Sequence, residues 1–317
     1  MKKIKTFILV LIFLMLVGCS NKLKEYTKTL HYFNEDINIK IYVSSEKRAN
    51  LVFKEIEDIY KTHENITDRL NINSEVSYIY NNHLIDDKIK ISNEMNDLIE
   101  YGFKLYQDSN HVLSINTGDL VDLWELEYKN NKIPSNDDLK NIDTSMDKIK
   151  LKNNILDNNH VNLNFDQFII GYTNNLVKKY LKSVNINYYF INTNNDILIG
   201  SGINNEDYVV ILSNPFNNET LKVYSMQNKY LKTISIYHNN YKYDDKIYSN
   251  IINAKDKTMA RNMISVSVLS DDVYTSEYLA NMLFILDYDS GYKLAKNYNV
   301  SVIWCYIENN EEKIQEM

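Results

Sequence analysis

Disulfide staples and chain-bending residues are scarce in this sequence: its 317 residues include two cysteines, two prolines and seven glycines. Two cysteines cannot build the disulfide framework that holds many small exported folds together. The fold must therefore be stabilised by a hydrophobic core. The composition, with 44% hydrophobic residues, permits such a core, and a chain of this length can bury it in a single large domain.

An excess of positive charge is also missing. Lys and Arg number 35 against 42 Asp and Glu, which gives a formal net charge of -7 at pH 7. Because a nucleic-acid surface needs clustered positive charge to contact phosphates, we expect no nucleic-acid partner. The chain also lacks generic signatures of catalysis, among them the Walker loop and the GxGxxG, HExxH, CxxC and GxSxG motifs. Its six histidines are scattered without the spacing of metal ligands.

One uncharged run stands out near the N-terminus, over residues 7–17, after a lysine-rich start. It is shorter than the roughly 20 residues that cross a bilayer as a helix, so it is typical of a cleaved signal peptide, here residues 1–18. The run ends in Leu-Val-Gly before Cys19, which is the pattern of a lipobox. We expect a lipid on the Cys19 thiol, a polar tether over residues 19–28 and a position on the outer face of a bacterial cytoplasmic membrane. The alternative is an ordinary secretory signal in which Cys19 is incidental.

The hydrophobic pattern changes its period several times along the chain. Apolar residues alternate over residues 37–43, which indicates a strand, and then recur at helical spacing over residues 52–60. Strands and helices follow in mixed order rather than as a regular βαβ repeat, so the pattern predicts an α+β fold in one domain over residues 29–317. The other expected helices span residues 95–106 with Ser92 as N-cap, 176–181 and 279–284, and the other expected strands span 188–191, 208–212, 264–269 and 300–307.

Two local features could carry chemistry. The first is the polar turn over residues 114–124, which contains Asp119 and Asp122 and runs into an apolar stretch ending at Trp124. It could form a ligand loop. The alternative, which the local pattern alone favours, is a loop-to-helix junction in which Asp119 caps the helix and Trp124 fills the core.

The second feature is the pair Glu277 and Asn281, spaced four residues apart. On a helix this spacing places both side-chain oxygens on the same side. Two hard oxygen donors in that arrangement suit Mg²⁺. Taken alone, the pair is more often part of a solvated helix face.

Six segments of the mature chain carry motifs in a fixed order. They are residues 74–81, Gly118, Leu120, Leu123 and Trp124 in the loop over residues 116–124, Leu163, Gly171 and Tyr172 in the segment over residues 163–172, Asp196, Ile197 and Gly200 in a GGDI-like strand, residues 248–253 for YSHIIDP, and residues 276–281 for ADALAT. In this order, and along nearly the whole mature chain, the segments resemble the ApbE-like family of FAD:protein FMN transferases. The family's TxGPLxxLW loop corresponds to residues 116–124, and its LDLGGIAKGY segment to residues 163–172.

The departures from the family pattern fall in its pocket segments. The family's lysine before Gly-Tyr is Ile170 here, and the family's metal pair of Asp and Thr is Glu277 and Asn281. Losing that lysine removes a charge that could hold a pyrophosphate. The other departures are Asn250 for histidine, Asn253 and Ala254 for aspartate and proline, Asn194 and Asn195 for paired glycines, and Ile234 and Ser235 for a serine-glycine pair.

The resemblance implies an ApbE-like fold and a reaction in which FMN passes from FAD to a threonine of an exported partner protein, with release of AMP. It implies Mg²⁺ held by Glu277 and Asn281. For the flavin pocket it implies Asn116, Gly118, Asp119, Gly171 and Tyr172. Two alternatives remain open at this point: a lipoprotein of the same fold that binds flavin or serves a structural role without catalysis, and an unrelated solute-binding lipoprotein.

Overall fold

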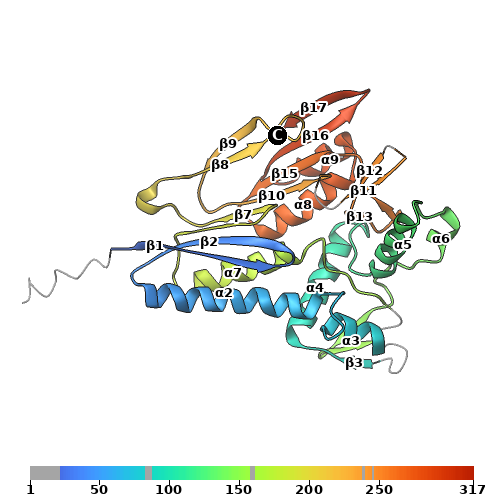
Figure 1. Cartoon of the computed structure of the whole chain (residues 1–317), viewed down its shortest axis with the longest axis horizontal. Coiled ribbons are helices and arrows are strands. Elements are labelled where there is room, and N and C mark those ends of the chain that lie inside the picture. Colours follow the sequence, from blue (N-terminus) through green and yellow to red (C-terminus); the bar gives the residue numbers. More distant parts are fainter. Residues whose placement is uncertain (1–21, 83–87, 158–160, 238–239, 245) are drawn as a thin grey trace, which may run out of the picture.

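A long antiparallel sheet forms the centre of the structure (Figure 1). The computed structural model describes residues 22–82, 88–157, 161–237, 240–244 and 246–317. The predicted signal peptide and Cys19 lie outside the described residues. In spatial order the eight strands of the sheet are β1 (Lys24–Tyr32), β2 (Glu35–Val43), β6 (Tyr189–Asn192), β7 (Asp196–Ile199), β10 (Tyr230–Ser235), β15 (Ser265–Ser270), β16 (Ser301–Glu308) and β17 (Glu311–Glu316).

The two faces of this sheet are covered differently. Helices α2 (Glu46–Thr67), α7 (Ile169–Ser183), α8 (Val273–Ile285) and α9 (Tyr288–Ala295) pack on one face, and the hairpin of β8 (Tyr208–Ser213) and β9 (Thr220–Met226) packs on the other. Side chains alternate between the two faces along each strand. On β10, Leu231 joins the cluster under the hairpin, whereas Tyr230 and Ile234 join clusters on the helix side.

Apart from a short 3-10 helix, η1 (Ile203–Asn205), between β7 and β8, the remaining elements form a second group beside the helix layer (Figure 1). The group shares the largest core cluster with α8, through side chains such as Met95, Ile115 and Leu279. Its helices are α3 (Glu75–Asn82), α4 (Asn93–Asp108), α5 (Gly118–Lys129) and α6 (Asn136–Lys140), and its short strands are β3 (Lys88–Lys90), β4 (Lys150–Lys152), β5 (Ile155–Asp157), β11 (Asn240–Tyr243), β12 (Lys246–Ser249), β13 (Ile252–Asn253) and β14 (Thr258–Met259).

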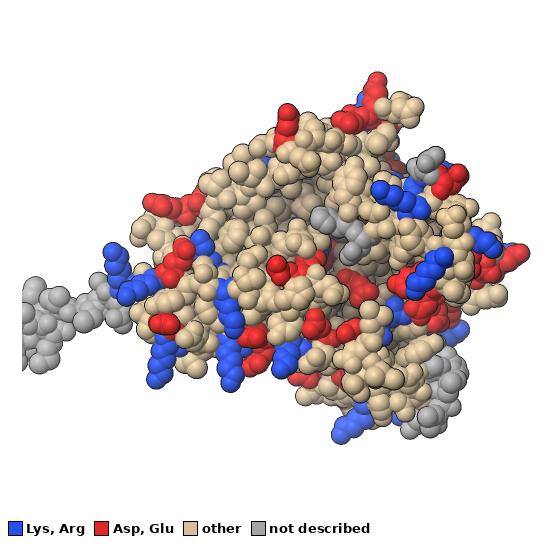
Figure 2. Space-filling view, viewed as in Figure 1, with Lys and Arg blue, Asp and Glu red and all other residues tan. Residues whose placement is uncertain are grey.

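Helix α2 is amphipathic, with the 3.6-residue spacing of apolar residues that predicted a helix here. Val52, Phe53, Ile56 and Tyr60 are buried on one face, while Lys, Arg, Asp and Glu side chains cover the opposite, solvent-facing side (Figure 2). This is the pattern of a helix that buries one stripe against a sheet. The predicted cap of α4 is also confirmed: the Ser92 hydroxyl accepts from the backbone N–H of Met95 at 3.1 Å.

The predicted elements are present, in the α+β class that the pattern indicated, but two boundaries differ. Lys24 to Lys28 do not form a tether, because they belong to β1, which pairs with β2 along its whole length. The alternation of this strand is weak because β1 lies at the sheet edge and Tyr26 is only half-buried. Helix α8 starts at Val273, six residues before the predicted start at residue 279, because Asp272 caps it by accepting from Thr275 N–H at 2.8 Å.

In the parts of the chain that are described, no helix combines the length and apolar character needed to cross a bilayer.

Candidate functional site

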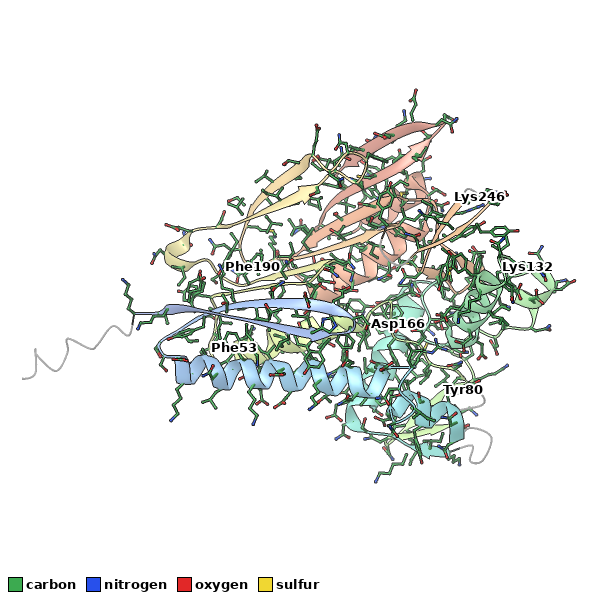
Figure 3. All side chains as sticks on the ribbon, in the orientation of Figure 1. Phe53, Tyr80, Lys132, Asp166, Phe190 and Lys246 are labelled. Carbon is green, nitrogen blue, oxygen red and sulfur yellow. The ribbon has the colours of Figure 1, made fainter. Side chains whose placement is uncertain are left out.

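Three of the segments that carry the family resemblance line one pocket of about 320 Å³, here called the central pocket. Asn164, Asp166 and Gln167 come from the segment before α7, Val121 and Glu125 come from α5, and residues 250 and 252 come from the third segment. Asp166 lies between the sheet with its helices and the group around α4 and α5 (Figure 3). The full lining is Val121, Glu125, Asn164, Asp166, Gln167, Asn240, Tyr241, Asn250, Ile252 and Met259.

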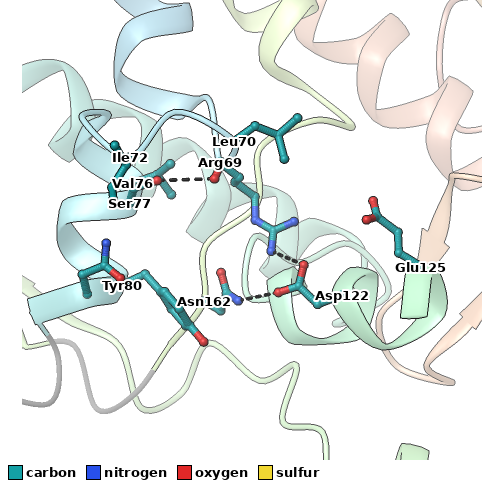
Figure 4. A pocket seen from close by; sticks show the side chains of 10 residues that line it. Arg69, Leu70, Ile72, Val76, Ser77, Tyr80, Asp122, Glu125 and Asn162 are labelled. Carbon is teal, nitrogen blue, oxygen red and sulfur yellow. Dashed lines mark hydrogen bonds and ion pairs between the residues drawn. The ribbon is translucent and has the colours of Figure 1, made fainter. Parts of the chain in front are cut away.

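A second pocket of about 330 Å³, here called the Arg69 pocket, adjoins the first, since Glu125 lines both. Arg69 reaches from the loop after α2 to Asp122 on α5, where its guanidinium lies 2.8 Å from Oδ1 (Figure 4). The Asn162 amide donates to Asp122 Oδ2 at 3.2 Å and to Asp119 Oδ1 at 2.9 Å. The lining is Arg69, Leu70, Ile72, Val76, Ser77, Tyr80, Asn81, Asp122, Glu125 and Asn162.

The predicted loop residues Gly118 and Asp119 each accept a hydrogen bond from a residue that lines the Arg69 pocket, Gly118 O from Arg69 and Asp119 Oδ1 from Asn162. Asp119 does not cap α5: the N-cap is Thr117, and Asp119 sits in the first turn, where its charge is favourable at the helix N-terminus. A Cβ atom at Gly118 would lie 2.2 Å from Asn162 Oδ1, so only glycine allows this approach. Trp124 is buried as predicted, at 5% exposure, and packs with Tyr248.

Asn116 and Tyr172, which the resemblance assigns to the flavin pocket, lie outside the linings of both pockets. The Asn116 amide donates to the backbone oxygens of Asp143 and Ser145, at 3.0 and 2.9 Å, and so ties two loops together. The Tyr172 ring packs against His63 and Tyr101, with centroids 5.6 and 5.0 Å away. Neither side chain lines the central pocket or the Arg69 pocket.

Glu277 and Asn281 share the buried side of α8, with exposures of 1% and 0%. The expectation that their spacing places both on one side of a helix is confirmed, and a solvated face is wrong for this pair. Gly171 on α7 lies directly against Glu277, because a Cβ atom there would come within 2.1 Å of Glu277 Cδ. The Asn281 amide donates to Gln167 O at 3.5 Å, which links α8 to the central pocket.

The structure adds three residues to Glu277 that the sequence did not single out as a site: Asp196, Tyr230 and Lys232. The Lys232 ammonium lies 3.1 Å from Glu277 Oε1 and 3.1 Å from Asp196 Oδ2. The Tyr230 hydroxyl donates to Glu277 Oε1 at 2.8 Å and also bonds Asp196. The sequence does contain one signal for this site. Lys232 is two residues from both Tyr230 and Ile234, so on a strand its charged side chain lies on the same buried face as these two residues.

Comparison with known proteins matches a model of the ApbE family to residues 33–304. The chain belongs to the ApbE family. An FAD:protein FMN transferase from Buchnera aphidicola subsp. Baizongia pistaciae is 24% identical over 257 residues, which cover 77% of this chain and 74% of that protein.

Solved ApbE structures share the fold. The flavin transferase ApbE from Vibrio cholerae superposes with a TM-score of 0.77 at 17% identity, covering 93% of this chain and 97% of that chain. The apo flavinyl transferase ApbE from Pseudomonas stutzeri gives a TM-score of 0.80 at 17% identity, with 93% and 95% covered. These similarities confirm the mixed helix and sheet fold predicted for this ApbE chain.

Burial and charge set the electrostatics around Glu277. Burial raises the pKa of Glu277 to about 8, against the opposing effect of the Lys232 ammonium. For Lys232, burial lowers the pKa, but the carboxylates of Asp196 and Glu277 outweigh burial and raise it overall. With all three groups ionised the cluster carries one net negative charge, and a proton on Glu277 balances it.

The Mg²⁺ that the family resemblance implies can be tested against these residues. Glu277 Oε2 and Asn281 Oδ1 are buried acceptors without a hydrogen-bond partner, which favours a cation. Glu277 Oε1, however, is already held by an ammonium and a hydroxyl, and the described segments contain no group of three or more His, Cys, Asp or Glu side chains suited to a metal ion. A fixed positive charge beside so few free oxygens does not fit a resident divalent cation.

Proposed function

We propose that this chain is a flavin transferase that takes FAD as its substrate and attaches FMN to a protein. The observation that carries the proposal is the central pocket, because three segments far apart in the sequence, each resembling a family motif, converge on it. Family membership and the relative from Buchnera aphidicola support the same function.

In the proposed reaction a threonine hydroxyl of the acceptor protein attacks the phosphorus on the FMN side of the FAD pyrophosphate. An oxygen–phosphorus bond forms, the pyrophosphate bond breaks, and AMP leaves with the bonding electrons while the hydroxyl loses its proton. Such a reaction depends chiefly on positioning and charge stabilisation rather than on covalent chemistry of the enzyme. No step is assigned to Mg²⁺, since the residues around Glu277 do not fit a resident ion.

The chain's own groups can serve this reaction by position. The central pocket offers amide and carboxylate side chains from Asn164, Gln167, Asn250 and Asp166 as hydrogen-bonding partners for a flavin nucleotide. The adjoining Arg69 pocket contains a guanidinium that is 16% exposed at its side chain. Because the two pockets meet at Glu125, a dinucleotide can extend from one into the other.

The proposed partner is an exported flavin-acceptor protein at the same membrane. This part rests on the lipobox at Cys19, which would place the chain on the extracytoplasmic face of the cell membrane through a lipid anchor. A transferase held there meets acceptors only after their export.

A second candidate is a lipoprotein that binds flavin without transferring it. The observation that favours it is the ion pair of Lys232 with Glu277, since it occupies a carboxylate oxygen that the family resemblance assigns to a metal. In this case the central pocket retains the ligand while transfer is lost.

Incubation of the purified chain with FAD and an exported acceptor protein tests these candidates. If the chain is a transferase, we expect free AMP and a flavin fluorescence that stays on the acceptor protein through denaturing electrophoresis. FAD bound by the chain without AMP release would favour the non-catalytic binder. A chain that does not bind FAD at all would contradict both the transferase and the flavin-binding lipoprotein.

A further inference from the structure

The ammonium of Lys232 sits between two buried carboxylates on the helix-covered face of the sheet. Lys232 and Asp196 are direct cross-strand partners on β10 and β7, and the ammonium lies 3.2 and 3.1 Å from the two carboxylate oxygens of Asp196. From the opposite side, Glu277 on α8 brings Oε1 to 3.1 Å. Three carboxylate oxygens therefore surround one nitrogen.

This cluster is shielded from water. Asp196 and Glu277 are each 1% exposed and Lys232 is 7% exposed. Lysine is almost never buried to this degree unless it is paired, since removing an ammonium from water is costly. The cost is offset here by the Asp196 carboxylate, by the Glu277 carboxyl oxygen at 3.1 Å, and by the Tyr230 hydroxyl, which lies within hydrogen-bond distance of both carboxyl groups.

A metal ion that bridges two carboxylates would need the position between them. In this chain a side chain already fills that position and carries positive charge. We propose that Lys232 is the resident cation of this site, standing in for a divalent metal at Asp196 and Glu277, so that the folded chain alone does not bind Mg²⁺ there. The inference goes beyond flavin transfer, because it concerns the chain without nucleotide.

Metal titration without flavin tests it. We would use Mn²⁺, a paramagnetic substitute that accepts the same oxygen ligands as Mg²⁺, and count bound ions by electron paramagnetic resonance. The wild type should have no Mn²⁺ site that depends on Glu277, so the wild type and Glu277→Gln should bind the same number of Mn²⁺ ions. Lys232→Ala leaves two carboxylates without their cation and frees space between them, so it should gain a site at least about tenfold tighter than any in the wild type.

Two further variants make the result specific. Lys229→Ala is the matched control. Lys229 directly precedes β10 and is also ion-paired, but the side chain of its partner Asp271 is 69% exposed. No Mn²⁺ site should therefore appear in this variant. Lys232→Met combined with Asp196→Asn removes one charge of each sign. It keeps the cluster foldable if Lys232→Ala does not fold, and it should still gain Mn²⁺ binding at Glu277, more weakly than Lys232→Ala.

A wild-type Mn²⁺ site that Glu277→Gln abolishes would overturn the proposal, as would a folded double variant that gains no binding. Mg²⁺ provides a second readout, since a ligand that binds only the native state raises the melting temperature. Mg²⁺ should raise it for Lys232→Ala and leave the wild type unchanged. Because flavin is absent throughout, these outcomes are separate from success or failure of the proposed transferase reaction.

Discussion

Gly171 on α7 and Glu277 on α8 are in such close contact that any side chain added at position 171 would overlap the Glu277 side chain unless one of the two shifted. A Cβ atom at Gly171 would lie 2.1 Å from Cδ of Glu277 and 2.2 Å from its Oε1. Glycine therefore sets the distance between α7 and α8, and it holds Glu277 against the sheet where Lys232 can reach it.

Gly171→Ala should destabilise the protein by about 1–2 kcal/mol, because overpacking costs ~1–3 kcal/mol and the better helix propensity of alanine returns only part of it. Urea unfolding measures the difference. Gly291→Ala on α9 is the matched control, since the nearest atom to its new Cβ would be the end of the Leu283 side chain, at 3.2 Å, and the next, Trp304 Nε1 at 3.6 Å, is at ordinary contact distance. It should change stability by less than about 0.5 kcal/mol. Equal stability of the two variants would contradict the close contact.

Trp124→Ala should cost ~3–5 kcal/mol, because the indole is buried and its removal leaves a cavity that the surroundings fill only in part. Trp124 packs in a cluster with Leu120, Tyr248 and Ile252 beside the central pocket. Tyr128→Ala, at a position 37% exposed on the same helix, should cost much less. A melting temperature unchanged by Trp124→Ala would mean that this helix does not rest on the cluster.

His63 should make the protein less stable in mild acid. Burial lowers the pKa of His63 below its ordinary value of 6.5, against opposing effects of the Ile59 carbonyl, Glu94 and Asp97. As pH falls below 6.5 the unfolded chain takes up a proton at this position while the folded chain does not, so stability falls, by up to ~1.4 kcal/mol per pH unit.

His63→Gln removes the titratable imidazole. The unfolding free energy of this variant should therefore decline less between pH 7 and pH 5 than that of the wild type. Guanidinium unfolding at several pH values gives both curves. Parallel curves would show that His63 is protonated equally in the folded and unfolded chains.

A large side chain at position 250 should block the central pocket. Asn250 is exposed and lines the pocket, so Asn250→Trp is expected to weaken FAD binding at least about tenfold while the melting temperature stays close to that of the wild type. Asn297→Trp, at an exposed position after α9, is the control and should bind FAD as the wild type does. Calorimetric titration measures both. Unchanged FAD affinity in Asn250→Trp would move the flavin site elsewhere.

Cys19→Ala should abolish lipidation, because the thiol is the acceptor in the predicted lipobox. Metabolic labelling with a fatty acid shows whether the variant carries lipid, and fractionation shows whether it leaves the membrane. Label that persists on the variant would rule out this anchor.

Periodicity was sufficient for most of the fold because burial of one helix stripe or one strand face is recorded locally in the sequence. The cap at Ser92, the helix through Ile56 and the strand of β15 all follow from neighbouring residues. Edge strand β1 was missed for the same reason, since half-exposed positions at a sheet edge leave only a weak alternation.

The sequence by itself determined the mixed fold of the ApbE family and the placement of two side-chain oxygens, those of Glu277 and Asn281, on one side of a helix. Only the tertiary structure decided what faces that pair. The register of β7 and β10 places Lys232 opposite Asp196, and the glycine contact between α7 and α8 brings Glu277 to the same ammonium. Spacing along a chain fixes which side of a helix a residue occupies, whereas a charge supplied by another strand depends on packing between elements far apart in sequence.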